Sequence, residues 1–367
     1  MSRTDQRWMK LCLQAARRGR GQVSPNPLVG AAVVRGGRLV AQGHHARFGS
    51  DHAEVAALKK AGRRARGATL YATLEPCAHW GKTPPCVDTI VKSGVARVVV
   101  AMRDPHPLVN GRGFAALKRA GIPTAVGTLQ AEARALNEGY LSALTRRRPI
   151  VTLKAGMTLD GKIATASGES RWITSPAARR MAHRMRAEND AILVGIGTVI
   201  QDRPRLTARP SPPARRQPIR VVLDTNLSMS PRSPMLRERR GGRVIVYAAR
   251  GPTARRAAIE KAGAEVVIAG RGRGGVDIRQ VLGDLAARGV QTLLVEGGAE
   301  VAWSFLAGRA VDRVAFFVAP RIAGGRAAVP VVGGEGVRRL SEAFAVEDVA
   351  VRRIGPDLLI TGRLQGR

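Results

Sequence analysis

Hydrophobic residues near the start of the chain recur at helical spacing. Trp8, Met9 and Cys12 fall on one face if residues 5–18 form a helix. The proline-containing turn at 24–27 ends that pattern, because proline lacks the backbone donor that a helix needs. We therefore predict an amphipathic first helix, in which Cys12 is a core residue.

Strand and helix patterns then alternate through the first half of the chain. Residues 28–34 and 38–42 read as two strands of a hairpin joined at Gly36-Gly37. A helix begins at His52, and the elements predicted after it are a strand at 68–73, a helix at 87–92, a strand at 95–102, a helix at 113–120, a strand at 122–126 and a helix at 130–144. This alternation predicts a layered α/β domain.

A basic stretch at 146–149 separates this domain from a second one, so we place the domains at 1–147 and 148–367. The second half is predicted to hold strands at 150–154, 191–194, 220–223, 244–247, 266–268, 292–295 and 314–318, and a helix at 175–188. Proline and glycine concentrate at 209–218 and 270–275, which we expect to be surface loops. The second half is therefore also an α/β domain.

Length and cysteine content agree with two domains in a reducing compartment. A chain of 367 residues exceeds what one hydrophobic core usually organises. Three cysteines are too few for a disulfide framework. The first twenty residues lack an apolar leader segment, and no apolar run reaches membrane-spanning length. We expect a cytoplasmic protein without a membrane partner.

Charge is the most unusual bulk property. Lysine and arginine total 61 against 27 aspartate and glutamate, a formal net charge of +34. Such a field attracts nucleic acids or phosphorylated small molecules. The basic residues are spread through both halves and aromatic residues for base stacking are few, so we expect a small phosphorylated substrate and no nucleic-acid partner.

The candidate chemistry is densest between residues 52 and 86. A catalytic zinc uses about three protein ligands and leaves one position open, and His52, Cys77 and Cys86 could supply the three. Glu54 could then move protons between water and a leaving group. Zinc nucleobase deaminases carry H-x-E followed by P-C-x-x-C, but here eight residues separate the cysteines.

The longer motif Glu-Pro-Cys-Ala-His-Trp-Gly-Lys-Thr-Pro-Pro-Cys at 75–86 resembles the pyrimidine deaminase of bacterial riboflavin biosynthesis. The resemblance implies a cytidine-deaminase-like α/β/α layered domain with zinc on the three ligands and Glu54 as the catalytic acid and base. It also implies that Asn26 and His45 contact the pyrimidine. From the residues alone, a turn-forming asparagine and an exposed histidine would be the preferred interpretation of these two.

The second half contains two glycine-bearing turns where a strand meets a helix. Gly195 and Gly197 form the first, but Ile200 replaces the third glycine of a dinucleotide-binding motif. Glu296-Gly297-Gly298 forms the second. Such turns can present backbone N–H groups to a phosphate, although glycine more often serves a tight turn there. A standard Rossmann site is therefore not indicated.

Segments 154–162, 167–176 and 186–190, with these turns, resemble the reductase half of the same riboflavin enzyme family. The resemblance implies a dihydrofolate-reductase-like α/β domain that reduces the ribosyl side chain with NADPH. It places cofactor contacts at Gly156, Trp172, Thr198, Asp202, Thr225, Gly297 and Gly298. It places substrate contacts at Ser170, Arg186, Leu206, Arg209 and Glu296.

Several roles in this half stay open from the residues alone. Lys154 and Asp202 are candidates for proton delivery, with Lys154 as the expected catalytic residue, but each could instead form ion pairs. Trp172 could be a core aromatic or a wall of the nicotinamide site. Arg186 and Arg209 suit a phosphate but could be surface arginines.

We therefore expect a bifunctional enzyme that uses Zn²⁺ and NADPH on a phosphoribosyl pyrimidine and that forms a homodimer or homotetramer. Two alternatives remain at this stage. One is a deaminase acting on tRNA or single-stranded DNA, suggested by the positive charge. The other is a binding module with a structural zinc, which Glu54 argues against because a closed site has a fourth protein ligand.

Overall fold

The computed structural model describes residues 2–365 except 212, 215, 239 and 273. The chain divides into two compact units, residues 1–146 and 147–367. Each unit is described by itself. Within the described residues, no helix is both long and apolar enough to cross a membrane.

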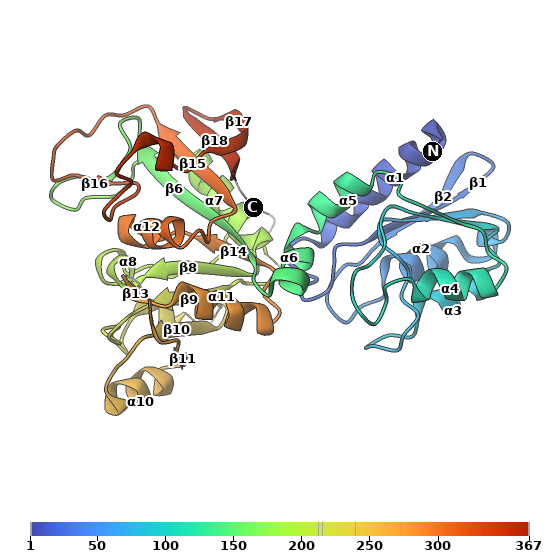
Figure 1. The fold of residues 1–367 in the computed structure, drawn as a ribbon, viewed down its shortest axis with the longest axis horizontal. Coiled ribbons are helices and arrows are strands. Elements are labelled where there is room, and N and C mark those ends of the chain that lie inside the picture. Colours follow the sequence, from blue (N-terminus) through green and yellow to red (C-terminus); the bar gives the residue numbers. More distant parts are fainter. Residues whose placement is uncertain (1, 212, 215, 239, 273, 366–367) are drawn as a thin grey trace. The chain divides into compact units, whose positions relative to one another are not determined.

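The first unit is built on one five-stranded sheet in the order β2-β1-β3-β4-β5 (Figure 1). The strands are β1 (Gly30–Arg35), β2 (Arg38–His44), β3 (Thr69–Ala72), β4 (Arg97–Val100) and β5 (Thr124–Val126). β1 runs antiparallel to both β2 and β3, whereas β3, β4 and β5 are parallel. The parallel strands need helical crossovers, which place their carboxyl ends at one edge of the sheet.

Helices cover both faces of this sheet. Figure 1 shows α1 and α5 on one side, and α2, α3 and α4 on the other. The bounds are α1 (Arg3–Ala16), α2 (Ala53–Ala61), α3 (Cys86–Ser93), α4 (Arg112–Arg119), α5 (Gln130–Leu136) and α6 (Glu138–Arg146), with short 3₁₀ turns at Arg17–Gly19 and Gly62–Ala65. Cys12 is fully buried in the resulting core, as its place on the apolar face of the first helix predicted.

The single helix predicted at 130–144 is wrong, because the structure breaks it at Asn137 into α5 and α6. The Asn137 side chain is buried, accepts from the Leu28 N–H at 2.7 Å and donates to the Leu28 carbonyl at 3.0 Å. These bonds tie the helices to the segment before β1. The helical pattern continues across the break, so the interruption comes from a contact 109 positions away in the chain.

The second unit is built on a nine-stranded sheet in the order β11-β10-β9-β8-β14-β6-β15-β18-β17. Its strands are β6 (Ile150–Thr158), β8 (Ala191–Gly195), β9 (Ile219–Leu223), β10 (Val244–Ala248), β11 (Ala264–Ile268), β14 (Thr292–Val295), β15 (Arg313–Ala319), β17 (Val346–Ile354) and β18 (Asp357–Leu364). The first seven in sheet order are parallel, and β18 and β17 continue the sheet antiparallel.

The helices of the second unit are α7 (Pro176–Glu188), α8 (Ile196–Asp202), α9 (Pro234–Arg237), α10 (Thr253–Lys261), α11 (Ile278–Ala287) and α12 (Ala299–Ala307), and a 3₁₀ turn covers Leu340–Glu342. Two further pairs are β7 (Lys162–Ala164) with β16 (Val329–Pro330), and β12 (Arg271–Gly272) with β13 (Gly275–Val276). The prediction that 270–275 is a surface loop is therefore wrong in part, because β12 and β13 pair within and next to this segment. The terminal hairpin of β17 and β18 was not predicted at all.

Strand order places the carboxyl ends of β6, β14 and β8 beside one another. The chain passes from β6 to β8 and outward to β11, then returns to insert β14 between β6 and β8. In open parallel sheets, ligands bind at such a reversal of strand order. α8 follows β8 directly, and α12 follows β14 after three residues.

Candidate active sites

The three proposed zinc ligands converge in the first unit, although they are far apart in the chain. His52 precedes α2, Cys77 lies in the loop after β3, and Cys86 is the first residue of α3. His52 Nδ1 lies 3.2 Å from Cys86 Sγ and 3.5 Å from Cys77 Sγ. One ligand atom from each residue lies within 4.8 Å of the others. One imidazole and two sulfurs at these separations suit a tetrahedral zinc with one open position.

The electrostatics of the two thiols differ. A hydrogen bond from Cys86 and one from His52 lower the pKa of Cys77 to about 4, whereas the bond to Cys77 and burial raise the pKa of Cys86. Cys86 sits at the amino end of α3, where the helix dipole favours a thiolate. A bound cation would favour the deprotonated form of both. The donor set therefore fits a divalent metal.

Glu54 lies beside this cluster in the first turn of α2. Its side chain is 3% exposed, and burial raises its pKa to about 7. Together with His52 and Cys77 it lines a cavity of about 310 Å³. The described residues offer no fourth ligand to the cluster, which leaves the carboxylate free to handle protons.

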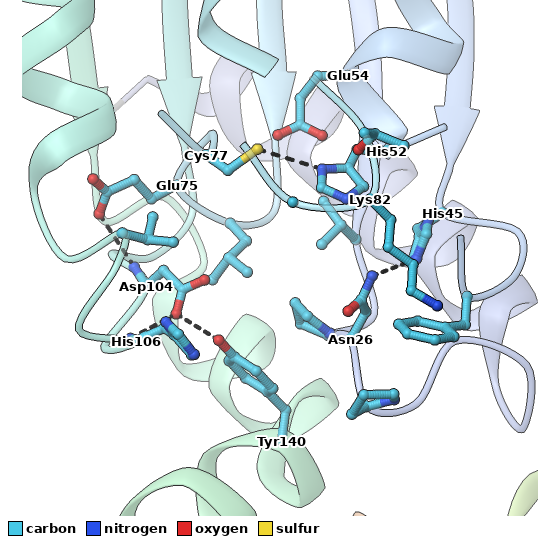
Figure 2. A pocket seen from close by; sticks show the side chains of 18 of the residues that line it. Asn26, His45, His52, Glu54, Glu75, Cys77, Lys82, Asp104, His106 and Tyr140 are labelled. Atoms are coloured by element: carbon cyan, nitrogen blue, oxygen red, sulfur yellow. Dashed lines mark hydrogen bonds between the residues drawn. The ribbon is translucent and has the colours of Figure 1, made fainter. Parts of the chain in front are cut away.

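Asn26 and His45 line the same cavity, on the wall that Figure 2 shows beside His52. Asn26 Nδ2 lies 3.1 Å from His45 Nε2, and His45 Nδ1 lies 3.1 Å from the Asp51 carbonyl. His45 is 2% exposed, so the reading of it as an exposed histidine is wrong. Burial lowers its pKa, which favours a neutral imidazole facing the cavity.

The opposite wall contains residues that sequence reasoning missed. Glu75 is buried and accepts hydrogen bonds from the backbone N–H groups of Asp104, Gly111, Gly113 and Phe114 at 3.1–3.5 Å. Asp104 in turn accepts from the Tyr140 hydroxyl at 2.9 Å (Figure 2). Glu75 lies in the motif that ends at Cys86, but nothing in the sequence pairs it with residues 104–114.

Lys82 is a second missed residue and belongs to the loop between the two cysteines. It lines the cavity, and its Nζ lies 4.0 Å from the centroid of the Phe48 ring, a cation–π contact. It is the one lysine among the residues that line this cavity. A lysine at the rim of such a cavity suits an anionic group on a substrate.

In the second unit, a cavity of about 690 Å³ opens at the carboxyl ends of the central strands. It gathers ten of the residues expected there: Lys154, Gly156, Ser170, Trp172, Arg186, Thr198, Asp202, Leu206, Arg209 and Glu296. Thr225, Gly297 and Gly298 do not line it. Gly298 is nevertheless close, since a Cβ built on it would lie 3.8 Å from Thr198 Oγ1.

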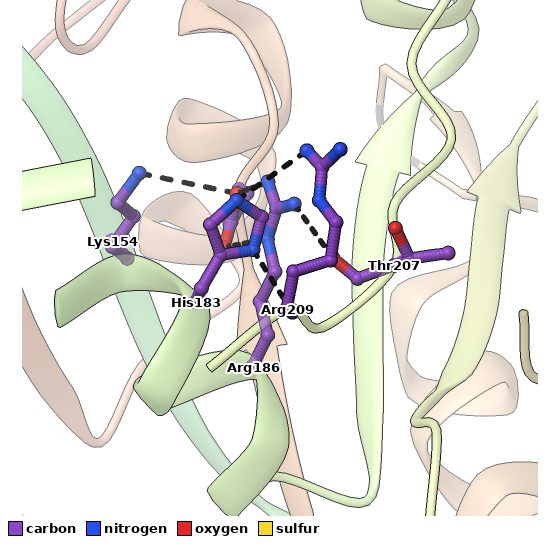
Figure 3. A network of polar contacts seen from close by, with 6 residues as sticks. Lys154, His183, Arg186, Thr207 and Arg209 are labelled. Atoms are coloured by element: carbon purple, nitrogen blue, oxygen red, sulfur yellow. Dashed lines mark hydrogen bonds and ion pairs between the residues drawn. The ribbon is translucent and has the colours of Figure 1, made fainter. Parts of the chain in front are cut away.

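Glu296 forms a charged network in this cavity with Arg186 and Lys154. Figure 3 shows these two residues together with His183 and Arg209. Glu296 accepts from Arg186 Nε at 3.0 Å and Nη2 at 2.6 Å, and Lys154 Nζ lies 3.9 Å away. Burial raises the pKa of Glu296, but Arg186 and Lys154 outweigh it and hold the pKa at about 2. Burial lowers the pKa of Lys154 in spite of Glu296. Lys154 therefore forms an ion pair with Glu296. An ion pair was one of the two roles that the sequence left open for this lysine.

His183 joins this network and was not singled out from the sequence. Its Nδ1 lies 3.3 Å from the Arg209 backbone nitrogen and its Nε2 lies 3.4 Å from Arg209 Nη2. Burial, with Arg186 and Arg209, lowers its pKa to about 4. The only sequence signal was its position one turn before Arg186 on α7.

Trp172 is not a core residue, because 61% of it is exposed. It lines the cavity, and Arg179 lies over its ring at 4.4 Å from the centroid. Asp202 accepts from the Ser170 hydroxyl at 3.2 Å. Leu206 is buried, with a positive φ of 50° that turns the chain at the cavity wall.

Comparison with known families covers both units. Residues 2–102 match the model of the cytidine and deoxycytidylate deaminase zinc-binding region, and residues 149–360 match that of the RibD C-terminal domain. The chain is 42% identical over 356 residues to riboflavin biosynthesis protein RibD of Aquifex aeolicus, covering 97% of each chain. It is 37% identical to RibD of Escherichia coli, covering 97% of this chain and 98% of that one.

Solved structures agree over the whole length. Acinetobacter baumannii RibD superposes with a TM-score of 0.89 at 34% identity, covering 99% of both chains. A diaminohydroxyphosphoribosylaminopyrimidine deaminase and 5-amino-6-(5-phosphoribosylamino)uracil reductase from Thermotoga maritima gives 0.85 at 36% identity, covering 98% of this chain and 99% of that one. The expected cytidine-deaminase-like and dihydrofolate-reductase-like α/β domains are confirmed. This chain belongs to the RibD family and is a bifunctional deaminase and reductase of riboflavin biosynthesis, dependent on zinc and NADPH.

Proposed function

We propose that residues 1–147 form the deaminase and residues 148–367 the reductase, and that His52, Cys77 and Cys86 hold the zinc. The observation that carries this assignment is the approach of three ligand atoms to within 4.8 Å of one another beside a buried carboxylate. When bound, the metal supplies a nucleophile from water at neutral pH. The substrate is a diaminopyrimidinone bearing a phosphoribosylamino group, as the names of the relatives indicate.

The chain's own residues supply the rest of the deamination. Glu54 takes a proton from water and delivers it to the departing amine, which leaves as ammonia. Asn26 and His45 hydrogen-bond the edge of the pyrimidine from the wall beside His52, since both line the cavity and already contact each other. Lys82 offers a cation for the substrate phosphate.

In the second unit, we assign cofactor binding to Gly156, Trp172, Thr198, Asp202, Thr225, Gly297 and Gly298, and substrate binding to Ser170, Arg186, Leu206, Arg209 and Glu296. When bound, NADPH would supply a hydride to C1 of the ribosyl group; the bond between C1 and the ring oxygen breaks, and this oxygen takes up a proton. Arg209 lines the cavity and offers a guanidinium for the substrate phosphate, and Glu296 can accept from sugar hydroxyls while it pairs with Arg186.

Lys154 donates the proton that completes this reduction. It lies in the cavity beside Gly156, and burial lowers its pKa, which makes the ammonium a better proton donor. Asp202 accepts a hydrogen bond from Ser170 and is assigned to cofactor binding, not to proton transfer. Lys154 is therefore the catalytic residue of the reductase.

We propose further that the protein is a cytoplasmic homodimer or homotetramer. Cys77 and Cys86 must stay reduced to bind metal, which a reducing compartment ensures. β17 forms one edge of the large sheet, and eight of its nine residues are exposed. Long exposed edge strands are usually covered in the native assembly, which supports association. Light scattering coupled to size exclusion tests the mass.

The test of the deaminase assignment is Glu54→Gln. Because only the proton carrier is lost, we expect zinc content to stay at the level of the unsubstituted protein while ammonia release falls by roughly 10²-fold or more. NADPH oxidation with supplied deaminated substrate should continue unchanged. Metal analysis, ammonia release and NADPH absorbance measure the three quantities on the full chain.

The control is Glu132→Gln, which removes an exposed carboxylate from α5. It should leave ammonia release unchanged. If the Glu54 variant still releases ammonia at the original rate, the role given to Glu54 is wrong.

A further inference from the structure

β9 and β10, which follow β8 in the order of the large sheet, end at its carboxyl edge in small polar turns. β9 is followed by Asp224-Thr225-Asn226, and β10 by Ala249-Arg250. The backbone N–H of Arg250 donates to the Thr225 carbonyl at 3.1 Å. Arg250 Nε donates to Asn226 Oδ1 at 2.9 Å. Arg250 is thus attached, through backbone and side chain, to the turn that contains Thr225.

The acidic residue of this turn faces inward. Asp224 is 1% exposed and accepts from the Ser228 N–H and hydroxyl, both at 2.9 Å, and from the Met229 N–H at 2.7 Å. Both carboxylate oxygens are therefore occupied. An exposed carboxylate at such a strand end would bind ribose hydroxyls and disfavour a phosphate there. The Asp224 carboxylate is buried and cannot do either.

The cation of the turn faces outward. Arg250 is exposed, and within the described part of the chain its two terminal nitrogens have no hydrogen-bond partner. The neighbouring Arg255 is different, because its Nε and Nη2 donate to the carbonyls of Leu227 and Ser228 at 2.7 and 2.9 Å. Arg255 braces the turn, whereas Arg250 presents a preoriented guanidinium to solvent.

We propose that Arg250, held by Asn226, binds the ribose 2′-phosphate of NADPH and makes the reductase prefer NADPH over NADH. The proposal rests on the cofactor placement given above, in which Thr225 and the turn at Gly298 contact the dinucleotide. A guanidinium fork matches phosphate geometry, and its anchoring reduces the entropy lost on binding. NADH lacks this phosphate, so it gains nothing from Arg250.

The strongly basic composition requires a matched control, because any removed arginine weakens the general attraction for the more highly charged NADPH. Arg243 provides it. It immediately precedes β10, so it lies at the opposite end of the same strand, and it is also exposed. Arg243→Ala removes the same charge without touching the carboxyl edge.

The experiment measures dissociation constants of NADPH and NADH on the full chain by calorimetry. For Arg250→Ala, we expect the NADPH constant to rise about tenfold or more and the NADH constant to stay within about twofold. Arg243→Ala should change neither by more than about twofold. Arg250→Lys, which keeps the charge but not the fork, should fall between Arg250→Ala and the unsubstituted chain. Equal losses for the 243 and 250 variants, or an unchanged NADPH constant for Arg250→Ala, would overturn the proposal.

A further variant tests, separately from the role of Arg250, the cofactor placement on which the proposal depends. Gly298→Asp puts a negative charge at the start of α12, and a Cβ is accommodated there, since Thr198 Oγ1 would lie 3.8 Å from it, an ordinary contact distance. We expect it to weaken NADPH and NADH alike. If it does so while Arg250→Ala changes nothing, the placement stands and the role of Arg250 is wrong. If Gly298→Asp changes neither constant, the placement is wrong and the proposal falls with it.

Discussion

At the scale of single residues, the second unit places a histidine among charges that determine its protonation. His183 lies between Arg186 and Arg209, with Glu296 as the compensating anion. Burial and the two guanidinium groups hold its pKa at about 4, against 6.5 for an ordinary histidine. The neutral imidazole lets two arginines share one wall of the cavity without a third positive charge between them.

This arrangement predicts a pH dependence of stability. Between pH 6.5 and about 4, the unfolded chain binds a proton at His183 that the native chain does not. The free energy of unfolding therefore falls as the pH drops through this range, and this contribution is fully present above 6.5. His183→Gln should lose less stability than the unsubstituted protein between about pH 7 and about pH 5, as measured by urea unfolding.

Arg209→Leu serves as the companion variant for this prediction. It keeps the histidine but removes one of the two charges that lower its pKa, so the pH dependence should become shallower. Identical pH dependence in all three proteins would show that His183 titrates normally and that the charge argument is mistaken.

At the scale of elements, the wall of the deaminase cavity opposite Asn26 is held in place by the Glu75 carboxylate. Glu75 accepts from four backbone N–H groups within residues 104–114, which comprise the end of the loop after β4 and the first turn of α4. Gly113 packs so closely there that a Cβ would lie 2.1 Å from the Pro76 carbonyl. A loop that carries cavity residues is thereby fixed to the motif that carries Cys77.

Glu75→Gln tests this anchor. The amide places an NH₂ group against backbone donors and loses the charge-assisted bonds, so we expect the first unit to be destabilised by about 2 kcal/mol or more. Hydrogen exchange of the 104–114 amides under increasing urea measures the loss locally. Glu132→Gln on exposed α5 is the matched control and should change stability by less than about 0.5 kcal/mol. Unchanged exchange in the Glu75 variant would mean that the loop is held by other contacts.

At the scale of the whole molecule, each unit has hydrophobic clusters of its own. One cluster fills the first unit, and further clusters lie on the large sheet of the second. The proposed zinc ligands all belong to the first unit, and the proposed NADPH contacts to the second. The two activities should therefore be separable by removing the metal.

Treatment with a chelator should abolish ammonia release while NADPH-dependent reduction of supplied deaminated substrate continues. Cys77, which is partly exposed and has a lowered pKa, should become reactive toward a thiol reagent, whereas Cys12 and Cys86, which are fully buried, should stay unreactive until the chain unfolds. Re-addition of zinc should restore ammonia release and protect the Cys77 thiol. Loss of both activities on chelation, or deamination without metal, would contradict this division.

The sequence by itself indicated the zinc chemistry and many of the regular elements. His52, Glu54, Cys77 and Cys86 could be singled out because a zinc site needs those residue types, and their segments form local strands and helices whose periodicity is visible in the chain. The same holds for the central strands of the second unit, which are continuous apolar runs. These local patterns predict the folded structure because the local preferences of a natural sequence agree with the packing of its core.

Only the tertiary structure decided which polar groups meet. Asn137 breaks a helix because it bonds to Leu28, and Asp224 is withdrawn while Arg250 faces outward because β9 and β10 end side by side. The same holds for Glu75 with its loop and for His183 with Arg209. Pairings between distant segments depend on strand order and burial, and neither is encoded in the spacing of residues along the chain.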